Sequence, residues 1–176
     1  MKFPEYLNIA TPRLSLRPVA DDDAAALYQI RSNALVNRYI GRALETNIAQ
    51  TEAFIGQRIA DRTARKAIYW VICKQDLDVP IGTICYWNME PDRNLAELGY
   101  ELHPDHQGQG YMREALEAVV KYGFEQMKLS VILALSEVDN VDSIRLLKHC
   151  NFVEDQAAHW VNQEASEGCV VYFLTI

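Results

Sequence analysis

The residues best suited to chemistry form a glycine-containing loop at positions 106–112, His-Gln-Gly-Gln-Gly-Tyr-Met. This loop joins a strand-like run, Leu95–Leu102, to a strongly helical segment. Its glycines, Gly108 and Gly110, let main-chain N–H groups approach a ligand closely. The helix that follows adds unpaired N–H groups and a positive dipole end, so the loop is suited to hold a phosphate or pyrophosphate. A lone Gly-x-Gly is also compatible with a simple tight turn.

Two familiar phosphate-binding motifs do not fit this loop. A dinucleotide-binding fingerprint requires a third glycine where Arg113 stands, followed by a carboxylate further along the chain. A P-loop requires Gly-Lys-Ser or Gly-Lys-Thr, and the sequence contains neither. The loop is therefore expected to hold the phosphates of another kind of ligand.

Length, composition and charge narrow the class of protein. The 176 residues fit one domain, residues 1–176, and 49% hydrophobic residues suffice for a sizeable core. No run of 18 apolar residues occurs, and residues 1–5 lack the apolar region of a signal peptide, so we expect neither a membrane span nor secretion. The net charge of −7 argues against a nucleic-acid partner.

The cysteines and histidines do not suggest a metal site or disulfides. Cys73, Cys85, Cys150 and Cys169 lie far apart without C-x-x-C spacing, and the four histidines do not cluster with them. We therefore expect reduced thiols in a cytoplasmic protein, and no metal.

Hydrophobic patterning predicts the elements that must position the loop. Alternating or continuous apolar residues predict strands at 11–17, 69–74, 81–88, 95–102, 131–135 and 169–176. Helical spacing and polar caps predict helices at 21–36, 47–65, 111–127 and about 140–149. Three or four antiparallel strands thus precede a β-α-β-α-β tail. This order predicts one α+β layer with a single parallel crossover.

Five short motifs, in order along nearly the whole chain, resemble the GNAT superfamily of N-acetyltransferases. The likeness is strongest to the branch that acetylates the N-termini of ribosomal proteins. The motifs are TPRLSLRP at 11–18, PIGTI at 80–84, AELGY at 96–100, QGQGY with EAL at 107–116, and N-x-x-S, LLK and NF within 140–152.

The resemblance implies a fold class and a ligand. The fold class is α+β (α/β), with a mixed, mostly antiparallel sheet that is splayed between its fourth and fifth strands and carries helices on both faces. Acetyl-CoA would bind in the resulting cleft, where its amides can pair with exposed strand edges. Gly99, midway along the fourth strand, is expected to form a bulge that opens the sheet.

The resemblance also implies an activity, the transfer of an acetyl group from acetyl-CoA to a primary amine. The acceptor could be a protein N-terminal α-amine or a small amine. A non-catalytic acyl-CoA-binding sensor or partner-binding module stays open, because the tyrosine that many members use as an acid is replaced here by Leu147. Neither nucleic acid nor a membrane is expected as a partner, and a monomer and a homodimer both remain open.

The resemblance assigns roles to individual residues. Glu97 is the candidate general base, and Glu101, on the same face of the strand, is its alternative. Ser143 matches the serine that the ribosomal branch uses as an acid, although a serine at a helix start can also be a cap. The expected cofactor-binding residues are Leu102, Gln107, Gly108, Gln109, Gly110, Tyr111, Met112, Asn140, Ser143 and Lys148.

Overall fold

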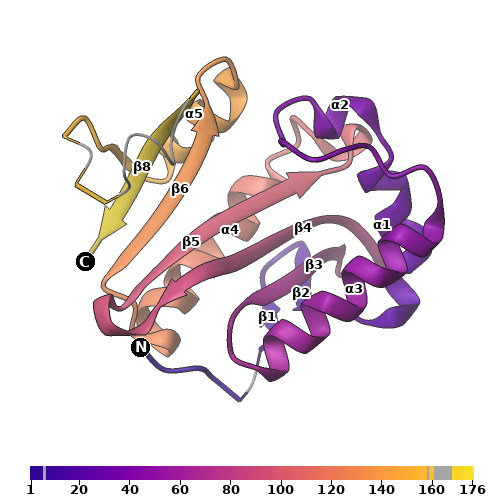
Figure 1. Ribbon diagram of the computed structural model, residues 1–176, viewed down its shortest axis with the longest axis horizontal. Coiled ribbons are helices and arrows are strands. Elements are labelled where there is room, and N and C mark those ends of the chain that lie inside the picture. Colours follow the sequence, from indigo (N-terminus) through magenta and orange to yellow (C-terminus); the bar gives the residue numbers. More distant parts are fainter. Residues whose placement is uncertain (6, 158, 161–167) are drawn as a thin grey trace.

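The computed structural model describes residues 1–5, 7–157, 159–160 and 168–176. Within these residues, eight strands form one sheet in the order β1-β2-β3-β4-β5-β6-β8-β7 (Figure 1). The strands are β1 Ile9–Ala10, β2 Leu14–Pro18, β3 Ile68–Lys74, β4 Leu77–Glu90, β5 Leu95–Leu102, β6 Val131–Glu137, β7 Val153–Glu154 and β8 Cys169–Thr175. Neighbouring strands are antiparallel except β5 and β6, which are parallel. The mixed α+β fold class is therefore confirmed.

The sheet is splayed between β5 and β6. These are the fourth and fifth strands expected from the sequence, because the short β1 precedes the first expected strand. These strands pair only from Leu95 opposite Val131 to Glu97 opposite Leu133. Beyond that point β5 stays paired with β4 as far as Leu102, while β6 stays paired with β8. The two halves of the sheet consequently diverge, and the ribbons of β5 and β6 separate toward the upper part of Figure 1.

Helices cover both faces of the sheet. They are α1 Ala24–Arg31, α2 Ala34–Asn37, α3 Ile48–Thr63, α4 Tyr111–Tyr122 and α5 Val141–His149. A π-helical turn, Gly123–Met127, extends α4, and short 3-10 turns occur at Asp21–Asp23, Pro91–Arg93 and Pro104–His106. In Figure 1, α1 and α3 lie in front of the sheet and α4 lies behind it.

Alternation along the strands divides the core between the two faces. On β3, Trp70 and Ile72 face the larger cluster, to which α4 contributes Leu116 and α5 contributes Leu147. The intervening Val71 and Cys73 belong to a second cluster with α1 and α3. The central strand β3 is thus buried on both sides, which fixes the positions of the helices that border the cleft.

Two sequence-based expectations about backbone geometry are wrong. The helix expected at 21–36 is interrupted, because Asn33 Oδ1 accepts hydrogen bonds from the N–H groups of Leu35 and Val36 and starts α2 as a separate helix. Gly99 forms no bulge but pairs in register with Cys85. The irregularity lies in β4 between Trp87 and Glu90.

Packing against the neighbouring strand, rather than a bulge, explains why position 99 is a glycine. A Cβ atom there would lie 3.2 Å from Cys85 Sγ on the neighbouring strand. The two strands separate after Glu97, the last residue of β5 that pairs with β6. They do so without a bulge residue in β5.

The cysteines form no disulfides, and no described helix is suited to cross a membrane. All four cysteines are free thiols, and Cys73 and Cys150 are buried. Among the described residues, none of the helices combines the length and the apolar character needed to cross a bilayer.

Candidate functional site

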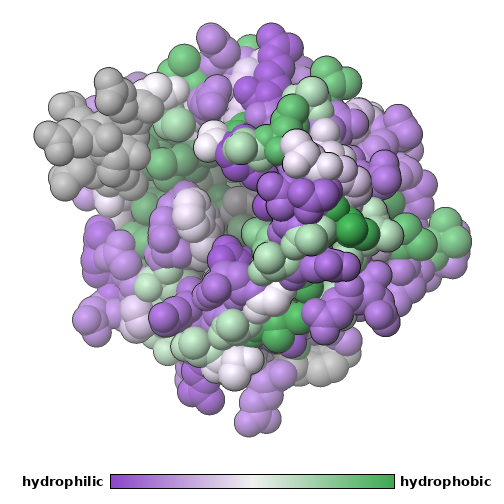
Figure 2. Space-filling view, turned by 45° about the vertical axis from the view of Figure 1, so that its right-hand side comes forward, coloured by the Kyte–Doolittle hydropathy of each residue, from purple (hydrophilic) through white to green (hydrophobic). Residues whose placement is uncertain are grey.

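A cavity of about 410 Å³ lies where β5 and β6 separate. Its walls come from the end of β5, the loop at 106–112, the region of α2 and the start of α5. Figure 2 shows the surface hollowed near its centre, with hydrophobic residues deep in the hollow. The cavity brings together eight of the expected site residues: Leu102, Gln107, Gly108, Gly110, Tyr111, Met112, Asn140 and Ser143.

The glycine loop has the geometry of an anion-binding turn. Gly108 has φ of 71° and Gly110 has φ of 78°, a left-handed conformation that favours glycine. Gly110 immediately precedes α4, so the first N–H groups of that helix have no partner within it. Gln107 Nε2 donates to the Leu102 carbonyl at 2.9 Å and so ties the loop to the end of β5. The main chain here can hold a phosphate.

Arg13, which sequence reasoning did not single out, braces this loop and holds it in place through several contacts. Arg13 donates through Nη1 to the Gln109 carbonyl at 3.0 Å and forms an ion pair with Glu114 at 2.6 Å. Its guanidinium also lies 4.7 Å from the centre of the Tyr111 ring. Although partial burial opposes the effect, hydrogen bonds from Thr11 and Arg13 lower the pKa of Glu114. The brace thus retains its charge at neutral pH and fixes the first turn of α4.

Ser143 points its hydroxyl group at β5. Its Oγ lies 2.7 Å from the hydroxyl of Tyr100, which also lines the cavity. The N–H of Ser143 instead donates to Asn140 Oδ1 at 3.2 Å, so Asn140 is the helix cap. Burial raises the pKa of Tyr100 to about 12, and the hydrogen bond with Ser143 partly opposes that rise. Sequence reasoning singled out Ser143 but not Tyr100.

Glu97 lies at the closed end of the splay rather than in the lining of the cavity. It is the last residue of β5 that pairs with β6, opposite Leu133. Its half-buried carboxylate accepts a hydrogen bond from Asn88 Nδ2 at 2.9 Å. Burial raises the pKa of Glu97, while the Asn88 amide opposes the rise.

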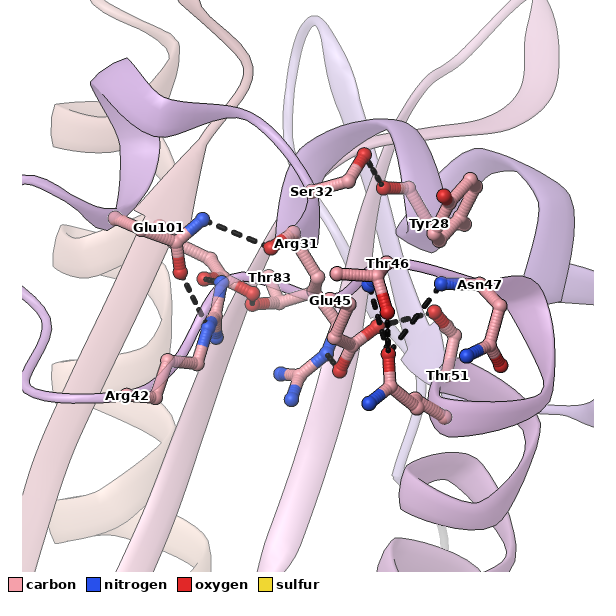
Figure 3. A network of polar contacts seen from close by, with 12 residues as sticks. Tyr28, Arg31, Ser32, Arg42, Glu45, Thr46, Asn47, Thr51, Thr83 and Glu101 are labelled. Carbon is pink, nitrogen blue, oxygen red and sulfur yellow. Dashed lines mark hydrogen bonds and ion pairs between the residues drawn. The ribbon is translucent and has the colours of Figure 1, made fainter.

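Glu101 lines the cavity, but its carboxylate is already committed. Arg42 Nη2 lies 2.6 Å from Glu101 Oε2, and Thr83 and Tyr69 donate to Oε1 at 3.2 and 3.3 Å. Figure 3 shows Arg42 approaching Glu101 from the segment that follows α2. This buried ion pair anchors residues 38–47 to β5.

A second ion pair holds the same segment to the helices. Arg31 Nε donates to Glu45 Oε1 at 2.5 Å, both side chains are buried, and the Thr51 hydroxyl also donates to Glu45 (Figure 3). Arg42 Nε in turn donates to Asn37 Oδ1 at 2.5 Å. The cavity wall that this segment and α2 present is mostly apolar and consists of Leu35, Val36, Tyr39 and Ile40.

Two expected cofactor-binding residues lie outside the cavity. Gln109 turns its side-chain amide back to the Asp105 carbonyl, at 2.8 Å. Lys148 is exposed on α5, with Nζ 6.0 Å from the centre of the Tyr172 ring. Neither side chain joins the group formed by the loop, Asn140 and Ser143.

Comparison with known proteins identifies relatives along most of the chain. Residues 13–153 match the family model described as an acetyltransferase (GNAT) domain. An uncharacterized N-acetyltransferase of Bacillus subtilis, YoaA, is 35% identical over 147 residues, covering 84% of this chain and 83% of that protein. The ribosomal-protein-serine acetyltransferase of Escherichia coli is 33% identical over 76 residues, or 43% of this chain and 42% of that protein.

Solved structures share the same fold. RimL, described as a ribosomal L7/L12 alpha-N-protein acetyltransferase in complex with coenzyme A, superposes with a TM-score of 0.83. The alignment covers 97% of this chain and 98% of RimL, at 21% sequence identity.

Proposed function

This chain belongs to the GNAT acetyltransferase family and is an acetyl-CoA-dependent N-acetyltransferase, and we propose that it acetylates a protein N-terminal α-amine in the cleft between β5 and β6. The reaction needs four things: a seat for the cofactor phosphates, an amine in its neutral form, a polarised thioester and a stabilised leaving thiolate. Groups suited to three of these tasks border the cleft: a seat for the phosphates, a base for the amine and a hydrogen-bond donor for the thiolate.

The donor side of the cleft is suited to acetyl-CoA. The N–H groups at the start of α4, after Gly110, would hold the pyrophosphate. Beyond Glu97 and Leu133, the facing edges of β5 and β6 do not pair with each other. The amides of the pantetheine arm can occupy such edges as an added strand would. Asn140, which lines the cavity, can bind a further amide.

Glu97 is the proposed base. An ammonium group must lose a proton before it attacks the thioester, and a carboxylate whose pKa is raised by burial is a better base near neutral pH than an exposed one. Because Glu97 lies at the closed end of the splay, we place a water between it and the amine. Glu101 is assigned instead to anchoring residues 38–47 through Arg42.

Ser143 is the proposed hydrogen-bond donor to the thiolate of CoA. Its hydroxyl lines the cavity and is not needed as a helix cap, since Asn140 fills that role. Leu147, at the position where many relatives carry a tyrosine acid, is fully buried. A hydrogen bond suffices here because a thiolate is a good leaving group.

We infer a peptide N-terminus rather than a polyamine as the acceptor from the charged and apolar side chains that line the cavity. In the described part of the chain, two carboxylates line the cavity, and neither is both buried and unpaired: Glu101 is buried and paired with Arg42, whereas Asp142 is exposed and forms a surface pair with Arg145 at 3.3 Å. A polyamine would need a free carboxylate for its second ammonium group. The apolar wall from Leu35 to Ile40 suits a peptide N-terminus with uncharged first residues.

Competing acceptors test this assignment. CoA release would be followed with a short peptide that begins with serine, the same peptide with a blocked N-terminus, and spermidine. We expect kcat/KM for the free peptide to exceed that for spermidine by about tenfold or more, and the blocked peptide to be inactive. A preference for spermidine would overturn the acceptor assignment while leaving acetyl transfer intact.

A further inference from the structure

We propose that Tyr100 is a positioning residue for the departing thiolate, acting through Ser143. The phenolic hydroxyl would donate to Ser143 Oγ, which leaves the serine proton free to point into the cavity toward the sulfur of acetyl-CoA. The role of Tyr100 rests on the function proposed above for Ser143, and it adds a residue on the opposite arm of the cleft.

The position of the pair supports this role. Tyr100 lies on β5 beyond Glu97, where the strand has already separated from β6, and Ser143 lies in the first turn of α5. Their hydroxyl oxygens are 2.7 Å apart, and both residues line the cavity. The bond therefore joins β5 to the first turn of α5 within the cavity in which the thioester would bind.

The chemistry of the two hydroxyl groups sets the direction of the bond. A phenol is a stronger donor than an aliphatic alcohol, so the favourable arrangement has Tyr100 donating and Ser143 accepting. Burial raises the pKa of Tyr100 to about 12, which keeps the phenol protonated at neutral pH. A hydroxyl that accepts one hydrogen bond donates the next one more strongly, because hydrogen bonds in a chain polarise one another.

Ser143 is free to take part in such a chain. Its N–H is bound by Asn140, and in the described residues its hydroxyl bonds to Tyr100 and to no main-chain carbonyl. A serine near a helix start otherwise tends to bond to the main chain of its own helix. The interaction with Tyr100 holds the side chain toward the cleft instead.

The transfer step balances without a proton from either hydroxyl. The amine nitrogen forms a bond to the carbonyl carbon, the carbon–sulfur bond breaks, and sulfur leaves with the electron pair as a thiolate. Before the attack, one proton of the ammonium group passes to Glu97 through water; the second proton, which the nitrogen loses as the amide forms, passes to solvent. A thiol has a pKa of about 8.5, well below the pKa of about 12 of the Tyr100 phenol, so the departing thiolate accepts a hydrogen bond from Ser143 and takes no proton from either hydroxyl of the pair.

Four variants test the proposal: Tyr100→Phe, Ser143→Ala, the double variant, and Tyr28→Phe as a control. Tyr100→Phe keeps the ring, and we expect kcat to fall about two- to tenfold while the KM for acetyl-CoA changes by less than about twofold. If Tyr100 acts through Ser143, adding Tyr100→Phe to Ser143→Ala should lower kcat no further. Tyr28 lies on α1, away from the cavity, so its variant should match the wild type.

The outcomes separate this role from a structural one. The double variant leaves neither hydroxyl unpaired, so it stays informative even if Tyr100→Phe alone folds poorly. An unchanged kcat in folded Tyr100→Phe would overturn the role of Tyr100. So would a Tyr100→Phe substitution that lowers kcat by the same factor in the wild type and in the Ser143→Ala variant. A wild-type protein that binds acetyl-CoA but acetylates no amine would instead overturn the proposed function.

Discussion

At the scale of single residues, two glutamates on one face of β5 differ in their partners. Glu97 is half-buried and accepts a hydrogen bond from the neutral amide of Asn88. Glu101 is buried against the cation of Arg42. Among the residues that the structure describes, no cation is paired with Glu97, and burial raises its pKa, which suits it to accept a proton. The same strand thus supplies one candidate base and one structural anchor.

Replacing Glu97 tests the base assignment. We expect Glu97→Gln to lower kcat by about 10²–10⁴-fold with unchanged acetyl-CoA affinity, because the amide cannot accept the proton. In the wild type the carboxylate is active only when deprotonated, so kcat/KM should fall as the pH drops through the raised pKa of Glu97. The variant should lose this acidic limb, which a pH–rate profile measures.

Glu101→Gln is the matched control on the same face of the strand. It removes the charge partner of Arg42 and should lower the melting temperature and raise the KM for the acceptor, since residues 38–47 lose their anchor. The acidic limb should persist. Loss of that limb in Glu101→Gln, with near-normal turnover in Glu97→Gln, would exchange the roles of the two glutamates.

The sequence pointed to individual candidate residues only where they belong to a motif. Ser143 and Asn140 were found because they belong to a motif with fixed spacing. Tyr100 was not found, because a tyrosine on an alternating strand is typical of the core and its partner is 43 residues away. The pairing of Glu101 with Arg42 was equally hidden, since it joins a strand to an irregular segment.

At the scale of elements, the glycine loop and α4 act as one unit braced by Arg13. The brace joins the start of β2 to the Gln109 carbonyl and to Glu114 in the first turn of α4. The hydrogen bond from Gln107 to the Leu102 carbonyl separately ties the loop to the end of β5, which lines the cavity. The position of the phosphate seat therefore depends on a contact between residues about a hundred positions apart.

A substitution at Gly110 tests this unit. Gly110 has φ of 78°, and a Cβ there would lie 3.4 Å from Arg13 Nη2, so Gly110→Val should strain the turn and displace the brace. We expect acetyl-CoA affinity, measured by calorimetry, to fall at least about tenfold. Gly56→Val, on exposed α3 with open space around it, is the control. Equal affinity in both folded variants would contradict the phosphate seat.

Elements with strong patterning were predicted well, and those set by tertiary contacts were not. The expected strand at 95–102 coincides with β5, and the helix expected at about 140–149 matches α5, Val141–His149. The break after α1 depends on Asn33 turning its side chain onto the next helix, which hydrophobic spacing cannot reveal. The role of Gly99 depends on the sulfur of Cys85 in the adjacent strand.

At the scale of the whole molecule, the proposed function depends on a sheet whose strands β5 and β6 pair at one end and separate at the other. Three residue pairs join β5 to β6, and each strand then follows its other neighbour. The opening places the glycine loop, Tyr100 and Ser143 around one cavity. The segment at 38–47, held by two buried ion pairs, borders the same cavity from the side of α1 and α3 (Figure 3). In the proposed reaction, the donor and the acceptor would contact different elements of this cleft.

The position of the transferred acetyl group tests the central claim most directly. The protein would be incubated with isotopically labelled acetyl-CoA and a peptide that has a free α-amine and one internal lysine, and the product would be fragmented by mass spectrometry. The proposed reaction predicts the label on the α-amine, in an amount equal to the CoA released. Label on the lysine side chain alone, or no labelled peptide despite bound acetyl-CoA, would contradict it.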